Sequence, residues 1–270
     1  MGDLRDLFGK SSISDIEKYR MLCKSAAYRE SVFSNFRIRR IYTRIVEGVR
    51  IDIGKRCLDW IVENHPEMVD RFNEFRKNDD NGGPRLYDYG KYGSFASITL
   101  RYIKVLCDLV DLYGSLDGMD IVEIGSGYGG QCRIISSVFD FNSYTMIDLE
   151  ESLMLVRRYL SKYGTKRTNL IQANSVPEIR SDLLISNYAF SECRRFIQRM
   201  YLEKLILPSV KGYMTMNFIN GKESFTSFKR EDLVRLIPNV FENSEHPISH
   251  IENIVLTWDR TLSPLIKIDR

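Results

Sequence analysis

The distribution of apolar residues divides the chain into two parts. Up to about residue 113, apolar side chains recur at the spacing of one helix face, as in Phe33, Phe36, Ile41, Ile45 and Val49. This period predicts a series of amphipathic helices, the last of them over 95–113. The stretch RKNDDNGGPRLYDYGKYGS, residues 76–94, is rich in turn formers and tyrosines. It is typical of a linker or a lid between two helical blocks.

From residue 120 onward, short β-branched runs alternate with helical stretches. The strands are expected near 120–125, 143–148, 168–172, 182–187, 211–218 and 253–258, with a seventh near 245–250. The helices are expected near 129–139, 150–163, 192–206 and 229–237. Alternation of this kind predicts an α/β fold with a mostly parallel sheet that is covered on both faces. We therefore expect an N-terminal helical region over 1–94 and an α/β domain over 95–270.

Composition narrows the class of protein. The chain has 270 residues, of which 43% are hydrophobic and 28% charged, as in an ordinary globular protein. No apolar stretch is long enough to span a bilayer, and the first ten residues, MGDLRDLFGK, lack the apolar middle of a signal peptide. A net charge of +3 does not indicate a nucleic-acid partner. The five cysteines form no C-x-x-C pair, which favours reduced thiols and a cytoplasmic location.

The stretch IVEIGSGYGGQ, residues 121–131, follows an apolar strand and opens a helix. Gly125, Gly127 and Gly129 fit the G-x-G-x-G of a methyl-donor site, whereas Gly125, Gly127 and Gly130 fit the G-x-G-x-x-G of a dinucleotide site. In such sheets ligands bind at the carboxyl ends of the strands. Asp148 ends the next strand, SYTMID, where its carboxylate can accept hydrogen bonds from both ribose hydroxyls of an adenosine. The pattern therefore predicts a nucleoside cofactor.

Three details favour a methyl donor over a dinucleotide. Glu123 lies inside the strand just before Gly125, where a carboxylate suits a cationic ligand, and S-adenosylmethionine carries both an ammonium and a sulfonium. Apart from the start of the following helix, nothing in the segment offers a pyrophosphate a partner. A late antiparallel strand pair is the usual ending of the methyltransferase variant of this fold. An NAD-dependent nucleotide-sugar oxidoreductase and a non-catalytic cofactor-binding protein are the alternatives.

Several segments resemble one known family. LRYIKVLCDL, IVEIGSGYGGQCRIIS, YTMIDLEESLMLVRRYL and LLISNYAFSEC are similar to the sugar O-methyltransferases encoded in bacterial surface-polysaccharide clusters. The resemblance runs from about Asn78 to Trp258. It implies a class I methyltransferase domain over 95–270, S-adenosylmethionine as the donor, and a sugar hydroxyl of a nucleotide sugar or surface glycan as the acceptor. The expected cofactor-binding residues are Glu123, Gly125, Ser126, Gly127, Tyr128, Gly129, Asp148, Leu149, Asn174, Ser175 and Asn187.

Transfer of a methyl group to a sugar hydroxyl requires a base, because the hydroxyl is a weak acid. The loop SNYAFSEC, after the fourth strand of the sheet, offers Asn187 and Tyr188 as hydrogen-bonding groups and Glu192 as a candidate base. Alternatively, Glu192 is an acid in the first turn of the next helix, where it favours the helix dipole. His246 and His250, in EHPISH, are the other catalytic candidates, with packing or surface roles as their alternative. The acids and histidines form no recognisable metal signature, so no metal is expected.

Two further features admit a structural and a functional interpretation. The run FRIRRIYTR, residues 36–44, predicts an amphipathic helix with a solvated basic face, or a contact with anionic lipid or a nucleotide-sugar diphosphate. Its arginines are Arg37, Arg39, Arg40 and Arg44. Tyr87 and Tyr92, among the glycines of residues 76–94, either contact the sugar from a lid or fasten the loop to the domain.

The remaining expectations concern partners and one histidine. The predicted partner is a small-molecule sugar or a glycan, with no nucleic acid and no transmembrane segment, although peripheral membrane contact fits the basic run. The N-terminal helices are the expected surface for a homo-oligomer. His65, which precedes Pro66, is expected to cap a helix rather than to act in catalysis.

Overall fold

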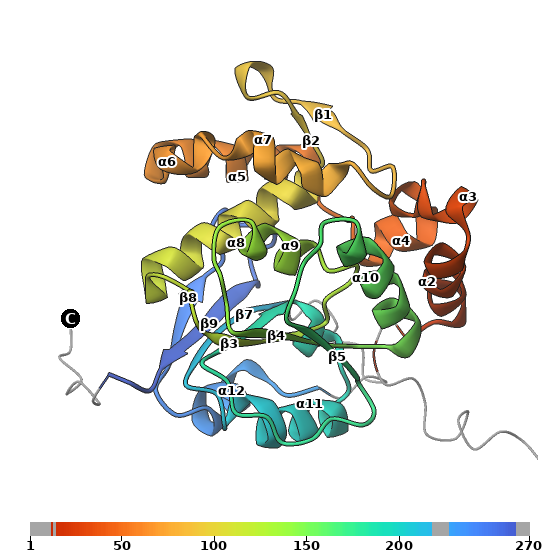
Figure 1. Ribbon diagram of the computed structural model, residues 1–270. Coiled ribbons are helices and arrows are strands. Elements are labelled where there is room, and N and C mark those ends of the chain that lie inside the picture. The colour runs from red at the N-terminus through yellow and green to blue at the C-terminus, as the bar shows by residue number, and fades with distance from the viewer. Residues whose placement is uncertain (1–11, 13–14, 218–226, 263–270) are drawn as a thin grey trace, which may run out of the picture.

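Short runs of buried apolar residues form the seven strands of the main sheet (Figure 1). The computed structural model describes residue 12 and residues 15–217 and 227–262. The strand order is β5-β4-β3-β6-β7-β9-β8, and neighbouring strands are parallel except for β9, which runs antiparallel to both β7 and β8. The predicted α/β fold is therefore confirmed. The strands are β3 (Asp120–Ile124), β4 (Ser143–Asp148), β5 (Thr168–Gln172), β6 (Leu183–Asn187), β7 (Lys211–Met216), β8 (Val240–Ser244) and β9 (Ile254–Asp259).

Helices cover both faces of this sheet, because its central strands are apolar on both sides. α8 (Ser97–Tyr113), α9 (Gly130–Ser136) and α10 (Glu150–Ser161) lie on one face, and α11 (Arg195–Tyr201) and α12 (Arg230–Leu236) lie on the other (Figure 1). The helix predicted over 192–206 is divided into a 3₁₀ turn η4 (Ala189–Glu192), α11, and a π-helical turn η5 (Leu202–Ile206). The other helices begin and end close to their predicted bounds.

The prediction of a strand near 245–250 is wrong. The seventh strand is β8, Val240–Ser244, and residues 245–250 form the irregular connection that follows it. Pro247 has no N–H group for a strand ladder. The backbone N–H of Ser249 donates instead to the carboxylate of Glu245, at 3.0 Å. Local side-chain hydrogen bonding therefore replaces strand pairing in this segment.

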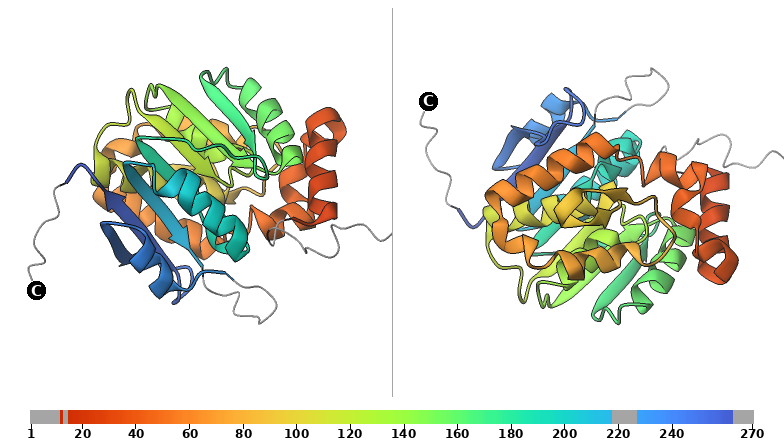
Figure 2. Two further views of the ribbon diagram at one scale, coloured as in Figure 1. Left: turned by 90° about the horizontal axis from the view of Figure 1, so that it is seen from below. Right: turned by 90° about the horizontal axis from the view of Figure 1, so that it is seen from above.

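The N-terminal helices pack against the same face as α8, α9 and α10 (Figure 2). α2 (Glu17–Tyr28) lies beside α10, and α5 (Ile51–Asn64) lies on α8. The shorter elements are α3 (Glu30–Phe33), η1 (Phe36–Ile38), α4 (Arg40–Ile45), α6 (Pro66–Val69), α7 (Phe72–Arg76), η2 (Lys77–Asp79), β1 (Tyr87–Asp88), η3 (Gly90–Tyr92) and β2 (Ser94–Phe95). One apolar core extends from these helices to the sheet. The domain boundary after residue 94 stays a prediction.

His65 occupies the expected cap position of α6, but its side chain makes no capping hydrogen bond there. It is the last residue before α6, and its ring nitrogens lie 3.1 Å from carboxylate oxygens of Glu67 and Asp111. The expected solvated basic face is wrong for Arg37, whose side chain is fully buried. No helix in the described ranges is long and apolar enough to cross a membrane.

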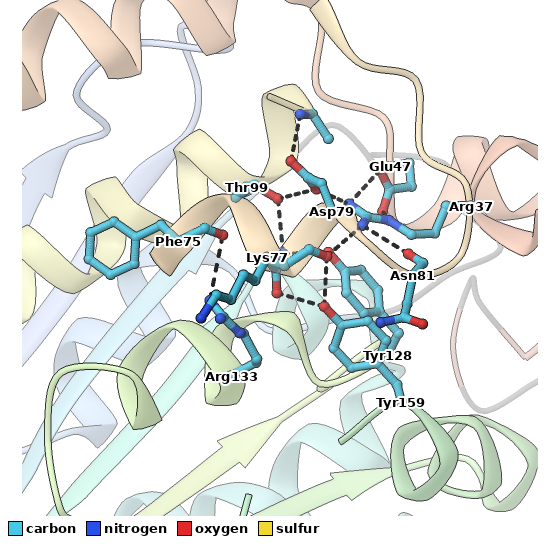
Figure 3. A network of polar contacts seen from close by, with 12 residues as sticks. Arg37, Glu47, Phe75, Lys77, Asp79, Asn81, Thr99, Tyr128, Arg133 and Tyr159 are labelled. Atoms are coloured by element: carbon cyan, nitrogen blue, oxygen red, sulfur yellow. Dashed lines mark hydrogen bonds and ion pairs between the residues drawn. The ribbon is translucent and has the colours of Figure 1, made fainter. Parts of the chain in front are cut away.

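Arg37 is the centre of a buried polar network (Figure 3). Its Nε donates to Glu47 Oε1 at 2.6 Å, and its Nη2 lies 3.1 Å from Asp79 Oδ1. Its Nη1 donates to the carbonyl oxygen of Asn78 at 2.9 Å. The guanidinium also lies over the ring of Tyr128, 4.6 Å from the ring centre. Charge pairing, hydrogen bonding and the aromatic ring together compensate for the loss of water around this cation.

The partners of Arg37 extend the network into the rest of the fold. Asp79 accepts hydrogen bonds from the backbone N–H of Ala96 at 2.8 Å and from the hydroxyl of Thr99 at 2.7 Å, at the start of α8. The side chain of Asn78 donates to the hydroxyl of Tyr128 at 3.1 Å and accepts from that of Tyr159 at 2.8 Å. Arg37 thereby ties the N-terminal region to α8, α9 and α10.

Removal of the Arg37 charge provides a test of this network. In Arg37→Met the carboxylates of Glu47 and Asp79 stay buried without their cation, so we expect the free energy of unfolding to fall by about 3–5 kcal/mol. Urea denaturation measures this change. Arg39→Met, at an exposed position of the same run, is the matched control and should change stability little. A loss for Arg37→Met no larger than that of the control would contradict the structural role of the network.

Candidate active site

Two neighbouring cavities lie at the carboxyl ends of β3, β4 and β6, where the strand order reverses direction. The smaller cavity has a volume of about 260 Å³ and the larger one about 480 Å³. Gly125, Asp148 and Ala189 line both of them. These three residues form a shared wall, so the two cavities are immediate neighbours. The site lies at the switch point of the sheet, where ligands of open α/β folds bind.

The glycine turn between β3 and α9 has the backbone geometry that its sequence predicted. Gly125, Gly127 and Gly129 have φ angles of +78°, +59° and +90°, which side-chain-bearing residues rarely adopt. A Cβ on Gly125 would lie 2.0 Å from the Cβ of Ala189. Gly130 begins α9, and a Cβ there would lie 2.5 Å from the ring of Tyr102. The first three glycines therefore permit the turn, and Gly130 permits close helix packing.

Asp148 lies at the wall that the two cavities share. One carboxylate oxygen accepts the backbone N–H of Gly127 at 2.9 Å, and the other accepts that of Leu149 at 2.7 Å. Burial raises the pKa of Asp148 to about 6, against the lowering effect of these hydrogen bonds. The carboxylate is thus oriented by the glycine turn, and it carries a negative charge at neutral pH.

Glu123 brings a second carboxylate to the larger cavity. It is 2% exposed, and its Oε2 accepts a hydrogen bond from the hydroxyl of Tyr144 at 3.0 Å. Burial raises the pKa of Glu123 to about 8. A buried acid with one hydrogen-bond partner favours a cationic ligand, because a cation would stabilise its charged form.

The smaller cavity combines apolar side chains with polar groups at its edge. Ile147, Leu149 and Ile197 contribute apolar surface, and Asn174 contributes an amide. Ser12 forms part of the wall of this cavity and pairs with the backbone of Cys193. This shape and polarity suit a flat, partly polar ring such as adenine.

The larger cavity contains most of the residues predicted from the loop after β6. Asn187, Tyr188 and Glu192 line it, and so does His250. Glu192 precedes α11 and is not part of its first turn, so the helix-dipole interpretation does not describe it. Burial raises the pKa of Glu192, although a hydrogen bond from the amide of Asn217, at 3.3 Å, acts to lower it. Glu192 is thus a half-buried acid on the wall of this cavity.

Two buried polar atoms at the larger cavity have no hydrogen-bond partner in the described part of the chain. They are the side-chain oxygen of Asn187 and the hydroxyl of Ser126. Buried polar groups are normally paired, so such atoms at a cavity wall are typical of a ligand site. Both residues were predicted to bind the cofactor, and both lie beside the glycine turn.

Other predicted site residues lie outside the two cavities. Tyr128 is fully buried, and its hydroxyl and ring contact the Arg37 network instead. Tyr92 packs edge-on against Phe72, with ring centres 6.0 Å apart, and Tyr87 belongs to the β1–β2 hairpin. His246 is exposed beside Trp60. The residues that line neither cavity are Tyr87, Tyr92, Tyr128, Gly129, Ser175 and His246.

Sequence reasoning named Arg44 only as part of the basic run over 36–44, and it missed the contribution of α8 and of Asn217 to the larger cavity. Arg44 and Val46 line it from the segment around α4, and Arg101 and Tyr102 line it from α8. Asn217, just after β7, also lines it. None of these positions belongs to a motif with a characteristic spacing, so only the folded arrangement identifies them. All five cysteines are free and buried, and the described residues include no cluster of three or more His, Cys, Asp or Glu side chains suited to a metal.

Comparisons with known proteins find similar structures but no similar sequence. No family model and no curated protein sequence matches this chain. An S-adenosylmethionine-dependent methyltransferase of Clostridium acetobutylicum is similar in structure, with a TM-score of 0.45, 12% identity, and coverage of 57% of this chain and 89% of that one. A protein of Thermoplasma acidophilum has a TM-score of 0.43 and 14% identity, over 60% of this chain and 89% of that one.

A third similar structure is an O-methyltransferase family 2 protein of Planctomyces limnophilus in complex with apigenin. Its TM-score is 0.41 and its identity 10%, over 53% of this chain and 50% of that one. The strand order of the present chain, rather than these likenesses, defines its fold. A parallel sheet whose last strand, β9, is inserted antiparallel between β7 and β8 is the class I methyltransferase arrangement.

Burial of Glu123 predicts how stability depends on pH. Between about pH 4.5 and pH 8 the folded protein holds a proton on Glu123 that the unfolded chain releases. The free energy of unfolding therefore falls as the pH rises through that window. Calorimetric melting of the ligand-free protein should show wild type losing stability relative to Glu123→Gln from pH 5 to pH 8. Glu63→Gln, at an exposed position of α5, supplies the control. Parallel curves for wild type and Glu123→Gln would contradict the assignment.

Proposed function

We propose that this protein is an S-adenosylmethionine-dependent O-methyltransferase whose acceptor is a sugar hydroxyl. One observation carries the proposal: two neighbouring cavities share the glycine turn and the half-buried Asp148, and the larger of them is also lined by the buried acid Glu123. The donor has an adenosine at one end and, at the other, a sulfonium and an amino acid that carries an ammonium and a carboxylate. The smaller cavity would hold the adenosine, and the larger cavity would hold the amino-acid part together with the acceptor.

The chemistry of the lining residues fits this donor. Asp148 would accept hydrogen bonds from the ribose hydroxyls, while Leu149 and Asn174 would contact the base. Glu123 would face the positive charges, and the unpartnered oxygen of Asn187 would accept a hydrogen bond from the ammonium group. The bound donor supplies an activated methyl group on its sulfonium, which becomes a neutral thioether on transfer.

The protein has two tasks in the reaction, namely to position the acceptor and to remove its proton. As the oxygen of the acceptor forms its bond to the methyl carbon, the hydroxyl proton must pass to a base. Glu192 suits this task because it lines the larger cavity and because burial raises its pKa toward neutrality. His250 lines the same cavity and is the second candidate. The sugar itself is inferred from the resemblance of the segments around the glycine turn and β6.

The geometry of the turn argues against an NAD-dependent oxidoreductase. A dinucleotide site uses free backbone N–H groups at the glycine turn to bind a pyrophosphate. In this protein the N–H of Gly127 donates to Asp148, and the N–H of Gly129 donates to the carbonyl oxygen of Ser126, at 2.8 Å. These donors are already used, so the turn is better suited to a ligand without phosphate.

Cofactor binding is the first test of the proposal. S-adenosylmethionine and S-adenosylhomocysteine should both bind in calorimetry, and NAD should not. Asp148→Ala should weaken S-adenosylhomocysteine binding by about 1.5–3 kcal/mol, as expected for loss of a charge-assisted hydrogen bond. Asp59→Ala, at an exposed position of α5 paired with Lys55, is the matched control. Binding of NAD without any response to S-adenosylhomocysteine would revive the oxidoreductase alternative.

Catalysis is the second test. A screen of nucleotide sugars and surface-glycan precursors, read by mass-detected methyl transfer, should yield an acceptor. With that acceptor, Glu192→Gln should lower kcat by about 10²-fold or more, because the amide keeps the size and hydrogen bonding of the side chain but cannot take a proton. Donor affinity should stay near that of wild type. If Glu192→Gln stays active while His250→Asn loses turnover, the base is His250 instead.

A further inference from the structure

Arg101 presents a cation to the larger cavity, with Glu245 as a nearby negative charge but with no direct ion pair in the described ranges. It projects from α8, is half-buried, and lines the cavity wall. Its guanidinium lies over the ring of Tyr188, 5.0 Å from the ring centre. Within the described ranges, it has no hydrogen bond or ion pair with any other side chain or backbone group. Arginine has five N–H donors in a planar fork, and stacking of the plane on a ring leaves the edges of that fork available.

The carboxylate behind Tyr188 is already satisfied by other groups. Glu245 accepts hydrogen bonds from the hydroxyl of Tyr188, from the backbone N–H of Ser249 at 3.0 Å, and from the amide of Asn253 at 2.9 Å. Burial acts to raise the pKa of Glu245, but side-chain hydrogen bonds from Ser249, Tyr188 and Asn253 lower it, and so does the nearby charge of Arg101. Glu245 thus fixes the ring that supports Arg101, and it leaves the N–H donors of Arg101 unused.

The backbone at Tyr188 also indicates a functional position. Its φ angle is +66°, a left-handed conformation that is costly for a residue with a large side chain. The backbone N–H of Tyr188 donates to the carbonyl oxygen of Thr215 at 2.8 Å, which holds the conformation in place. Strain of this kind persists where the surroundings enforce it, and here it places an aromatic ring under Arg101.

A second unpaired arginine lines the same cavity. Arg44, at the end of α4, forms no hydrogen bond or ion pair within the described part of the chain. Arg50, also on the wall, is paired with Asp52 at 2.9 Å. The acids of the cavity have other tasks in the proposed function, since Glu123 and Asp148 face the donor. Arg44 and Arg101 therefore face the two oxyanions that the site can receive, namely the carboxylate of the donor's amino-acid part and an oxyanion of the acceptor.

We propose that the acceptor carries an oxyanion, either the carboxylate of an acidic sugar or a phosphate of a nucleotide sugar, and that Arg101 and Arg44 bind it. This inference rests on the proposed function, because it assigns the acceptor class of the same site. A neutral sugar would displace water from the guanidinium of Arg101 without offering it a charged partner. The cost of removing that water would then weaken binding of the sugar. An oxyanion accepts charge-assisted hydrogen bonds from the guanidinium fork, and it fixes the orientation of the hydroxyl to be methylated.

The test measures binding rather than turnover. Protein saturated with S-adenosylhomocysteine is titrated with glucuronate, methyl glucoside, UDP and uridine in a calorimeter. We expect an anionic probe to bind at least tenfold more tightly than its neutral counterpart. Preference for glucuronate over methyl glucoside identifies a carboxylate, and preference for UDP over uridine identifies a phosphate. Equal affinity within both pairs would overturn the inference.

Variants locate the site of binding. Arg101→Gln should weaken binding of the preferred anionic probe at least tenfold and leave that of its neutral counterpart unchanged, and Arg44→Gln should weaken it to a smaller extent because Arg44 is exposed. Arg56→Gln, an exposed arginine of α5 outside the cavity, is the matched control. If Arg101→Gln and Arg44→Gln both bind the anionic probe as wild type does, the oxyanion is bound elsewhere and the inference is wrong.

Donor binding separates failure of this inference from failure of the proposed function. S-adenosylhomocysteine affinity of Arg101→Gln should match that of wild type, which also shows that the variant is folded. If a folded Arg101→Gln binds S-adenosylhomocysteine at least tenfold more weakly, Arg101 binds the carboxylate of the donor and the inference is wrong. A protein that binds S-adenosylhomocysteine but does not distinguish anionic from neutral probes refutes only the acceptor class. A protein that does not bind S-adenosylhomocysteine refutes the methyltransferase function itself.

Discussion

The buried guanidinium of Arg37 is the constraint on which the arrangement of the molecule depends. Its partners come from the loop after α4, through Glu47, and from η2, through Asn78 and Asp79 (Figure 3). Asn78 in turn contacts Tyr128 in the glycine turn. A charge in a protein interior is costly unless every partner is in place, so alternative positions of these segments are disfavoured. The network therefore fixes the elements that border the larger cavity.

The N-terminal region is consequently part of the candidate active site. The segment 44–50, anchored through Glu47, forms one wall of the larger cavity, and α8, anchored through Asp79, forms another. The sheet contributes the glycine turn and the strand ends, which any fold of this class provides. In the proposed function, the sheet would bind the donor, and the N-terminal helices with α8 would determine which acceptor enters.

The sequence was informative where its signals are local. Six of the seven strands and the glycine turn were predicted correctly, because apolar runs and glycines with positive φ act on their own segment. The strand expected near 245–250 lies at 240–244 instead. The position of Arg101 at the cavity could not be predicted from the sequence, because a single arginine in a helix usually lies on the protein surface. Its exposure to the cavity depends on Tyr188, far away in the chain. Arg37 was misjudged for the same reason, because its carboxylate partners are brought to it only by tertiary folding.

The larger cavity is lined by charged groups of both signs, among them Glu123 and Arg101. Glu123 is a carboxylate that burial holds against ionisation, and Arg101 is a cation without a hydrogen-bond partner. Burial of either side chain lowers the stability of the ligand-free protein. Residues that lower stability in this way are often found at functional sites. In the proposals above, the cationic sulfonium and ammonium of the donor beside Glu123 would favour its ionised form, and an anionic acceptor would give Arg101 the direct partner that Glu245 does not. The same two side chains would therefore discriminate against ligands of the wrong charge.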